Sequence, residues 1–284
     1  MAVLFDGVAF GLQLSLLAVG LTMIYGLGGV LNLAHGQFAA ATAIIGARLI
    51  EVGFPVALSV ISAVAISAGL AMAVDATLMR PVYRLHGEDR VLSSLLVTLG
   101  LAFAIDGLLI RFAPFTLLNL AVPGPAFVLL GVPMRRGVVV AALVAAVVLG
   151  VLVLVLRVSR WGRAVRSIIQ DEEGATLCGI DPSRMRRSVF ALSGALAGLV
   201  AVTQGLTAPI GATSGRDLTV LALIVTVVGG LGRVSGALVS GVLLGVVHAV
   251  ASHTIGAVLT FVLLLLVAIA VILLRPSGIV RSAV

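Results

Sequence analysis

Side chains that could bind a polar solute gather in one glycine-rich stretch between two apolar runs, residues 8–24 and 39–50. Glycine frees the backbone from helical geometry, and backbone groups freed inside a bilayer need new partners. Such a stretch is typical of a discontinuous transmembrane helix at a transport pathway. A short hydrophilic loop between two ordinary spans is the alternative interpretation. The polar residues are Asn32, His35 and Gln37, and the glycines beside them are Gly26, Gly28, Gly29 and Gly36.

The composition indicates a membrane protein. The 284 residues are 61% hydrophobic and 10% charged, and the mean hydropathy is +1.28. A soluble domain carries about 25% charged residues. We therefore expect an all-α, polytopic integral membrane protein. No basic region precedes the first apolar run, so a cleavable signal peptide is not expected.

The basic residues are all arginines, and the sequence contains no lysine. A P-loop needs a lysine to hold nucleotide phosphates, so any ATP-driven function requires a separate ATPase, and we expect no cofactor on this chain. The net charge of +7 is explained by arginine-rich cytoplasmic loops rather than by nucleic-acid binding. His248 and His253 have no further ligand types near them in sequence, so no metal site is expected.

Arginine clusters predict the topology. Residues 80–90 and 157–187 are the basic loops and are placed in the cytoplasm, and Arg275 places the C-terminus there too. The apolar runs give about eight or nine helical segments, some of them interrupted. The N-terminus lies outside if residues 25–38 separate two full crossings, and inside if they re-enter. The proline-rich residues 112–136 predict an interfacial excursion on the outer side, and the Gly/Ser/Thr-rich residues 207–217 predict a loop on the same side.

Two acidic residues fall within predicted spans. Asp75 stands beside Arg80 near the end of its span and is expected to be a plain anchor at the membrane interface. Asp106 lies deeper, within the run 91–110, and is the most intramembrane acid of the chain. It could line a translocation path, or it could pair with a polar group or water near the outer face.

The long polar loop contains a second functional candidate. Residues 162–179 are bounded by glycines and predict one short amphipathic helix beneath the membrane. An interfacial helix that only anchors the loop is one interpretation. A coupling helix that fits a groove on an ATPase subunit is the other. The apolar residues expected on one face are Val165, Ile168, Ile169 and Ala175.

A second glycine-rich interruption, residues 229–236, separates two later apolar runs. Gly29 and Gly36 have the same spacing as Gly229 and Gly236, which suggests an internal repeat. We expect a single transmembrane domain over residues 1–284, with approximate halves 1–112 and 137–284 and a coupling loop at 157–187. The interruption must be a true inner turn for the topology to be consistent.

The segment Gly28-Gly29-Val30-Leu31-Asn32-Leu33-Ala34-His35-Gly36 resembles the N-terminal motif of the branched-chain amino acid ABC transporter permeases, in the smaller of their two paralogous types. The resemblance continues through residues 162–180, the Gly-Gly-x-Gly at 229–232 and the Arg-Pro-x-Gly at 275–278. The chain departs from the family pattern at Gln37, Gly174 and Arg233.

The resemblance implies a bacterial inner-membrane permease subunit of an importer. It implies a paralogous permease subunit, two ABC ATPase subunits, a soluble substrate-binding protein and membrane lipid as partners. Candidate pathway and gating residues are Gly28, Gly29, Asn32, His35, Gly36, Gln37, Asp106, Gly229, Gly230 and Gly232. Candidate ATPase-coupling residues are Gly162, Arg163, Arg166, Asp171, Glu172, Glu173, Gly174, Ala175 and Gly179.

Alternatives remain for substrate and class. Leucine, isoleucine and valine are the default substrates of the family, which also serves urea, short amides and other small carboxylates. A stand-alone secondary transporter or channel would need ion-binding charges deep in several spans, and only Asp106 approaches this. The polar residues form no acid/base constellation, so a membrane-embedded enzyme is not favoured and no catalytic residue is expected.

Overall fold

The computed structural model describes residues 1–284 apart from 121, 123–125, 130–131, 276–277 and 280–284. Pro123 and Pro125 of the proline-rich segment, and Pro276 and Ser277 of the Arg-Pro-x-Gly ending, lie outside the described residues. The fold is all-α, as the sequence predicts. The longer helices are α1 (Ala2–Gly28), α2 (His35–Glu51), α3 (Val56–Val74), α5 (Gly87–Phe112), α6 (Arg136–Val158), α7 (Arg160–Gln170), α9 (Pro182–Gly205), α10 (Ser214–Gly229), α11 (Val234–Ile255) and α12 (Ala257–Leu274).

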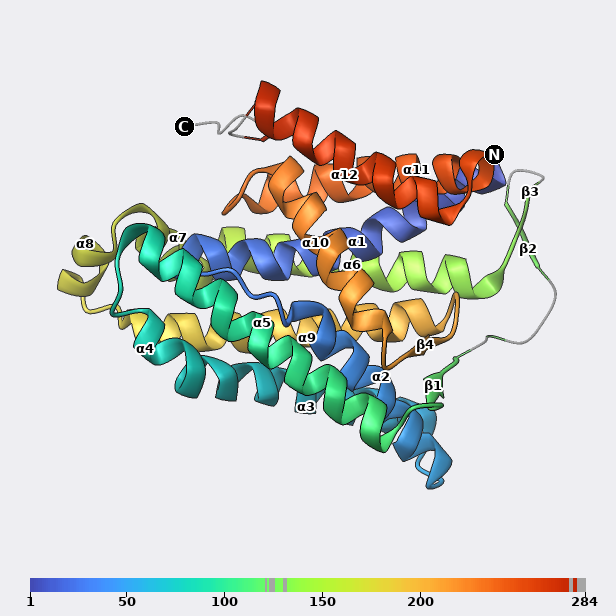
Figure 1. The fold of residues 1–284 in the computed structure, drawn as a ribbon, viewed down its shortest axis with the longest axis horizontal. Coiled ribbons are helices and arrows are strands. Elements are labelled where there is room, and N and C mark those ends of the chain that lie inside the picture. The colour runs from blue at the N-terminus through green and yellow to red at the C-terminus, as the bar shows by residue number, and fades with distance from the viewer. Residues whose placement is uncertain (121, 123–125, 130–131, 276–277, 280–284) are drawn as a thin grey trace.

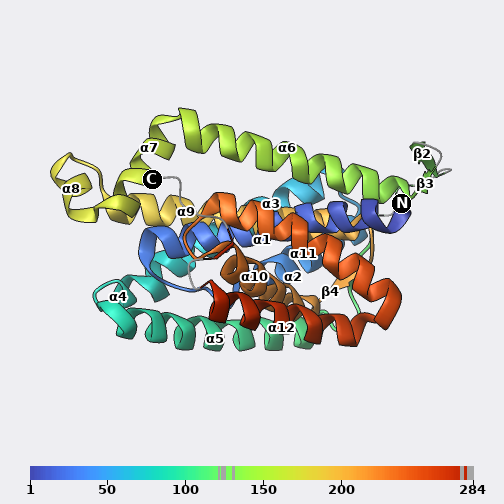
Figure 2. The same ribbon diagram turned by 90° about the horizontal axis from the view of Figure 1, so that it is seen from above.

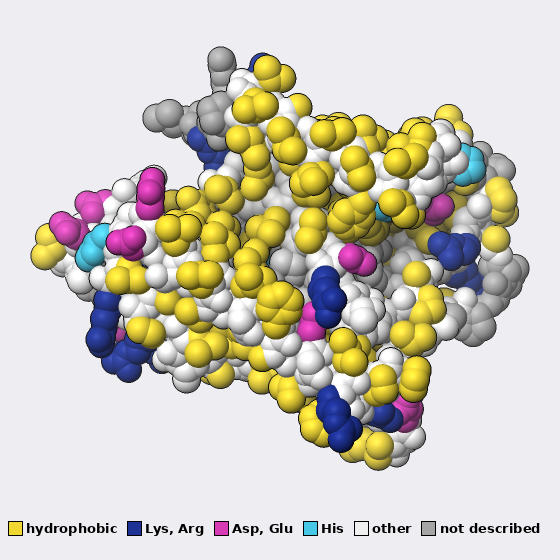
Figure 3. Space-filling view, in the orientation of Figure 1, with side chains coloured by type: hydrophobic (Ala, Val, Ile, Leu, Met, Phe, Trp, Pro, Cys, Tyr) yellow, Lys and Arg dark blue, Asp and Glu magenta, His cyan; other side chains and the backbone are white. Residues whose placement is uncertain are grey.

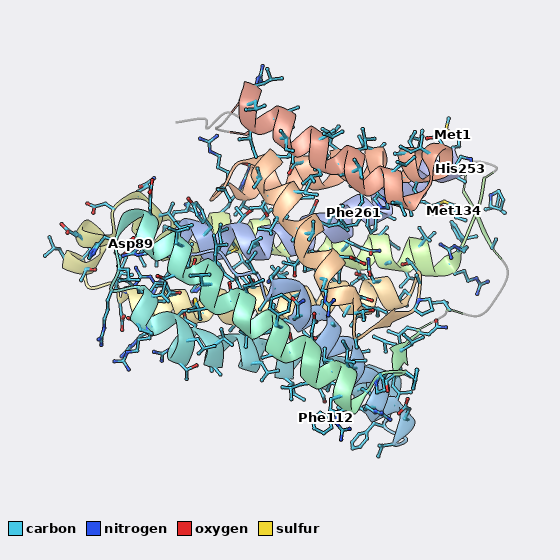
Figure 4. All side chains as sticks on the ribbon, viewed as in Figure 1. Met1, Asp89, Phe112, Met134, His253 and Phe261 are labelled. Atoms are coloured by element: carbon cyan, nitrogen blue, oxygen red, sulfur yellow. The ribbon has the colours of Figure 1, made fainter. Side chains whose placement is uncertain are left out.

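The helices form an elongated bundle with two distinct ends (Figure 1). One end, called here the α8 end, carries α7, α8 (Glu172–Leu177) and α4 (Arg80–Val82). The other, called the hairpin end, carries the N-terminus and the antiparallel strands β2 (Phe127–Leu129) and β3 (Val132–Met134). Met1, Met134 and His253 lie at the hairpin end, and Asp89 lies at the α8 end (Figure 4).

Seven helical segments among the described residues are long and apolar enough to cross a membrane. They are α1, the continuous Val56–Val82 segment, α5, α6, α9, α11 and α12. The helices α2 and α10 have 17 and 16 residues, which is about 25 Å of helix against a hydrocarbon core of about 30 Å. Both are too short to span alone, and both follow a non-helical stretch.

The interruption between α1 and α2 confirms the discontinuous helix. The first helix ends at Gly28, and Gly29 adopts φ 62°, where a side chain would be strained. Residues 29–34 then run back into the bundle from the α8 end, and α2 begins at His35 and continues to the hairpin end. The N-terminus therefore lies at the hairpin end, opposite α8 (Figure 1).

A matching interruption joins α9 to α10, which the sequence analysis took for an outer loop at residues 207–217. Helix α9 ends at the hairpin end, the chain forms β4 (Ile210–Gly211), and α10 begins inside the bundle at Ser214 and runs toward the α8 end. The helices α2 and α10 thus run in opposite directions from starts that lie side by side. This inverted pair, rather than the equal glycine spacing, is the repeat-like feature of the fold.

The glycines at 229–236 form a tight turn between α10 and α11 at the α8 end. Gly230 and Gly232 adopt φ 94° and 80°, and the backbones of Gly229 and Gly236 pack directly on each other. The topology requires a turn between these two helices, and the structure has one at the α8 end.

Helices from the two halves of the chain interleave. Seen from above, α1 lies in the middle, with α6 on one side and α5 and α12 on the other (Figure 2). A Cβ on Gly11 of α1 would meet Val242 Cα of α11 at 2.7 Å. Ser15 Oγ also donates a hydrogen bond to the carbonyl of Leu238, 3.0 Å away. Small residues let these two backbones touch, as membrane helix packing favours.

Described residues of the segment 112–136 form an excursion at the hairpin end. Its first strand, β1 (Leu117–Leu118), pairs with β4, so the excursion is tied to the stretch that precedes α10. Arg135 donates a hydrogen bond to the carbonyl of Thr207, 3.2 Å away, and adds a second tie.

The single helix predicted over residues 162–179 is wrong. Two helices, α7 and α8, meet at Asp171, whose backbone is extended at φ −156° and ψ 106°. The Asp171 carboxylate accepts a hydrogen bond from the amide of Gly174, 3.1 Å away, and so caps a new helix. Capping competes with helix continuation, which hydrophobic periodicity alone does not reveal. Val165, Ile168 and Ala175 are buried as expected, whereas Ile169 is 41% exposed.

Candidate functional site

The stretch before α2 is non-helical backbone inside a helical bundle, and side chains of α5 bind two of its amides. The amides of Leu31 and Leu33 donate to Ser94 Oγ and Thr98 Oγ1, each at 3.0 Å. Asn32 Oδ1 accepts from the amide of Ala34 at 3.0 Å, and Asn32 is buried. Side-chain partners replace the missing helical hydrogen bonds, which is the condition for non-helical backbone at membrane depth. Asn32 therefore shapes the stretch itself.

His35 joins three helices at the middle of the bundle. Its Nε2 donates to the carbonyl of Leu17 on α1 at 3.0 Å, and its Nδ1 accepts from Ser193 Oγ on α9 at 3.2 Å. This pattern fits the neutral ring. Leu17 and Ser193 lie near the centres of their helices, so α2 begins at mid-depth. His35 is 0% exposed, which makes it a structural tie between helices.

The starts of α2 and α10 cross at two glycines. A Cβ on Gly36 would overlap the carbonyl oxygen of Gly215, and one on Gly215 would meet Gln37 Cα at 3.0 Å. The amide of Gly36 donates to Thr219 Oγ1 of α10 at 3.0 Å. Both helix N-termini, each with a partial positive charge, therefore point into one region at mid-depth.

A polar chain leads from this crossing to a charged pair. Thr219 Oγ1 donates to Gln37 Oε1 at 3.1 Å, and Gln37 Nε2 lies 3.4 Å from Asp106 Oδ1 on α5. Asp106 Oδ2 accepts from Arg216 Nε on α10 at 2.5 Å. Asp106 does pair with polar groups, one of the two outcomes open from the sequence. The sequence analysis missed Arg216 and Thr219; the Arg216-Asp217 pair at the start of an apolar run was the available signal.

The candidate pathway residues thus separate into two groups. Asn32, His35, Gly36, Gln37 and Asp106 come together near mid-depth, where α2, α5 and α10 meet. Gly229, Gly230 and Gly232 form the turn at the α8 end, where a Cβ on Gly26 would meet Gly232 at 3.3 Å. Gly28 and Gly29 lie at that end too, beside Tyr83 and Arg90.

A second polar network lies at the α8 end and links α8 to α9, Tyr83 and the end of α1. The Arg186 Nη2 atom on α9 lies 2.5 Å from Glu172 Oε2 on α8, and its guanidinium stacks on the Tyr83 ring at 4.4 Å. Tyr83 donates through its hydroxyl to Asp75 Oδ1 at 2.7 Å. Arg90 donates to the carbonyls of both Tyr83 and Gly28. The network therefore connects α8 with the point where α1 ends.

The expectation for Asp75 is wrong. It is 4% exposed and lies in a short π-helix (Asp75–Met79) that continues α3, so it does not anchor the chain at an interface. The extra residue of a π-turn re-aims side chains, and such turns occur at functional sites. Burial and the neighbouring Asp75 carboxylate raise the pKa of the Tyr83 phenol, which stays a donor at every physiological pH.

The coupling candidates divide into structural and exposed residues. Gly162 packs against the carbonyl of Leu156, Asp171 and Gly174 form the α8 cap, and Ala175 is buried. Glu172 pairs with Arg186, and Gly179 ends the segment at φ 82°. Arg163, Arg166 and Glu173 are exposed, together with Leu177 at 90% exposure. The free surface is therefore the outer side of α7 and the end of α8.

Within the described residues, no group of three His, Cys, Asp or Glu side chains could hold a metal ion. His248 stacks on Phe10 with ring centroids 4.6 Å apart. It lines a cavity of about 380 Å³ at the hairpin end, with Asp6, Gln13 and His253 also on its wall. This cavity is separate from the cluster near His35.

Comparison with known proteins decides the family. The family model described as "Branched-chain amino acid transport system / permease component" matches residues 3–274. The chain belongs to this permease family. The permease is 30% identical over 298 residues to the high-affinity branched-chain amino acid transport system permease protein BraD of Pseudomonas aeruginosa, covering 97% of this chain and 94% of the relative. It is 26% identical over 304 residues to LivH of Escherichia coli K12, with the same coverage.

A solved structure shows the same fold at low identity. PsaBC from Streptococcus pneumoniae in complex with Fab contains a chain that matches with a TM-score of 0.51 and 12% identity. The match covers 94% of the permease and 91% of that chain. The arrangement of helices is therefore shared with a protein whose sequence is distant.

Proposed function

We propose that the permease is the transmembrane subunit of an ATP-binding-cassette importer that translocates leucine, isoleucine and valine. The observation that carries the proposal is the meeting of two discontinuous helices, α2 and α10, N-terminus to N-terminus at mid-depth beside polar side chains. This geometry is the substrate-path arrangement of transporters. The BraD and LivH relatives are named as branched-chain amino acid transport permeases, which supports the substrate class.

The α8 end faces the cytoplasm in this proposal. It carries most of the described arginines, and positive charge is retained on the cytoplasmic side. The C-terminal helix α12 also ends there, and the N-terminus lies outside. The arginines at this end are Arg80, Arg84, Arg90, Arg157, Arg160, Arg163, Arg166, Arg184, Arg186, Arg187, Arg233 and Arg275.

Partners supply what the permease lacks. Two ATPase subunits bind the α8 end and hydrolyse ATP, because the lysine-free chain has no P-loop. The exposed residues of α7 and α8 form the coupling surface, and the Glu172–Arg186–Tyr83 network carries its movement to the end of α1. A soluble binding protein delivers substrate at the hairpin end. A paralogous permease subunit completes the pathway.

The permease itself acts as one transmembrane domain, performs no covalent chemistry and holds no cofactor. ATP and Mg²⁺ belong to the partner subunits. The same architecture could carry urea or a short amide, since the binding protein sets the first selection. A stand-alone transporter is the second candidate class, and the ion pair Asp106–Arg216 at depth is the feature that favours it.

Purification tests the assembly. Tagged permease is solubilised from its native membrane in mild detergent, and the co-purifying proteins are identified by mass spectrometry. We expect Walker-motif ATPases and a second permease, and titration of the accompanying binding protein with leucine, urea and acetamide to show leucine binding. A partnerless permease that transports in liposomes without ATP would contradict the proposal.

A further inference from the structure

The Asp106–Arg216 pair is unevenly buried. The Asp106 side chain is 3% exposed, whereas the Arg216 side chain is 56% exposed. Arg216 donates to Asp106 through Nε, and among the described residues no other hydrogen-bond partner of its guanidinium is found. Both terminal nitrogens, with their four N–H groups, are therefore open to whatever lies outside this chain.

The pair lies at membrane depth. Asp106 is six residues before the end of α5, or about 9 Å of helix rise. Arg216 is two residues into α10, next to the mid-depth crossing of Gly36 and Gly215. The surrounding surface is largely apolar, with charged side chains of both signs near its centre (Figure 3). An arginine exposed to lipid within a span costs about 2.5–3.5 kcal/mol, so such a residue faces a polar partner or a water-filled path.

The open guanidinium of Arg216 and two helix N-termini are the groups of this region that attract an anion. The N-termini of α2 and α10 both point here, and each contributes a partial positive charge. The first turn of α2 holds no acidic residue, whereas the first turn of α10 holds the exposed Asp217 next to Arg216, so Asp106 and Asp217 offset part of the positive charge. A carboxylate placed at the free Nη groups of Arg216 would receive a bidentate pair of charge-assisted hydrogen bonds. Asp106 binds the Nε atom of Arg216 and provides the opposite charge.

We propose that Arg216, positioned by Asp106, forms half of a binding site for the main-chain carboxylate of a free amino acid. The inference rests on the proposed function and adds a recognition element to it. The paired permease subunit covers the open side. Gln37 and Thr219 hold Asp106 and α10 in place. A neutral solute such as urea has no carboxylate for the free Nη groups of Arg216, so the site discriminates against it.

The test uses the complete transporter in liposomes with saturating, leucine-loaded binding protein. ATP-driven uptake of radiolabelled leucine and the stimulated rate of ATP hydrolysis are measured together. The variants are Arg216→Gln, Arg216→Lys and the double variant Asp106→Asn with Arg216→Gln, and the control is Arg48→Gln. Arg48 forms an exposed ion pair with Glu51 near the end of α2, away from the site.

We expect Arg216→Gln to lower leucine uptake by about tenfold or more, because a charge-assisted carboxylate contact is lost, while ATP hydrolysis continues. Arg216→Lys keeps part of the uptake, and Arg48→Gln keeps all of it. The double variant stays as low as Arg216→Gln, because it restores charge balance without restoring a carboxylate partner.

Several outcomes overturn the inference. Recovery of uptake in the double variant means that the pair only balances a buried charge. Loss of the second permease subunit from purified Arg216→Gln means that the guanidinium binds that subunit instead. Efficient urea transport by the wild type would show that the site does not select an amino acid over a neutral solute. A wild type without ATP-driven uptake, or without ATPase partners, refutes the proposed function itself and is recognised before any variant is made.

Discussion

Single glycines decide whether the two discontinuous helices can meet. Gly36 and Gly215 place the backbone of α2 against that of α10, and the hydrogen bond from Gly36 to Thr219 needs this approach. His35 sits beside them and ties α2 to α1 and α9. The residues of the family motif therefore make packing contacts between helices. The polar chain from Thr219 to Arg216 begins next to these contacts.

Gly36→Ala should disrupt the crossing. The new Cβ would overlap the Gly215 carbonyl, and because both partners are backbone the helices must move apart. We expect a loss of about 1–3 kcal/mol or more in stability and loss of uptake. Thermal unfolding in detergent measures the first, and liposome uptake measures the second.

The matched control is Gly150→Ala, at an open position of α6 where a Cβ meets nothing within 4 Å. It should leave stability unchanged or raise it by about 1 kcal/mol, since alanine favours helix over glycine. Equal melting temperatures for Gly36→Ala and the wild type would contradict the packing argument.

Tyr83→Phe should destabilise the network at the α8 end. It removes the hydroxyl that donates to Asp75 and leaves a buried carboxylate oxygen without that partner. The expected cost is about 1–3 kcal/mol in the free energy of unfolding. Tyr25→Phe is the control, because the structure shows no hydrogen bond from the Tyr25 hydroxyl among the described residues. Comparable melting temperatures for the two variants would show that Asp75 does not depend on Tyr83.

The outer surface of α7 and α8 is exposed at the α8 end. Capping by Asp171 divides the segment, so the proposed coupling surface is a bent pair of helices instead of one rod. Glu172 of α8 pairs with Arg186 of α9, so this ion pair can transmit a movement of α8 to the transmembrane region. Leu177, at 90% exposure, is the large apolar side chain at its tip.

Leu177→Arg should weaken ATPase binding without unfolding the permease. An apolar contact at the centre of an interface is worth about 1–2 kcal/mol or more, and a charge placed there adds a desolvation cost. The measurement is the amount of ATPase that co-purifies with the tagged permease, with thermal stability as the check on folding. Phe115→Arg, 93% exposed at the hairpin end, is the control and should retain the ATPases. Full ATPase recovery with Leu177→Arg would exclude this tip from the interface.

The whole molecule combines long spans with two half-length helices. The path of the chain from the N-terminus at the hairpin end through α1–α12 brings the C-terminal helix to the α8 end (Figure 1). Arginine accumulates at that same end, which supports the proposed cytoplasmic side.

Labelling can verify this orientation with the natural cysteine. Cys178 is the single cysteine, and it is exposed at the end of α8. A membrane-impermeant maleimide should label it in inverted vesicles and leave it unlabelled in right-side-out cells. A Cys178→Ser, Phe115→Cys protein should show the opposite pattern. Labelling of Cys178 from outside the cell would reverse the proposed topology.

The sequence by itself determined the class, the family and the broken first helix. Low charge content and long apolar runs leave only an all-α membrane fold, and glycines with amides between two apolar runs indicate non-helical backbone. Arg216 illustrates the limit, because its partner is 110 residues away and sequence position carries no information on that distance. The capping at Asp171 and the burial of Asp75 likewise depend on hydrogen-bond contacts that only the structure reveals.

Only the tertiary structure decided where the second discontinuous helix begins and what the motif does. Residues 207–217 read as a polar loop because their composition suits one, yet β4 pairs with β1 and carries the chain back to mid-depth. Glycine spacing pointed to residues 229–236, which proved to be a turn. The physical reason is that hydrophobic pattern fixes which segments enter the membrane, whereas depth and direction follow from which backbones can touch, as at Gly36 and Gly215.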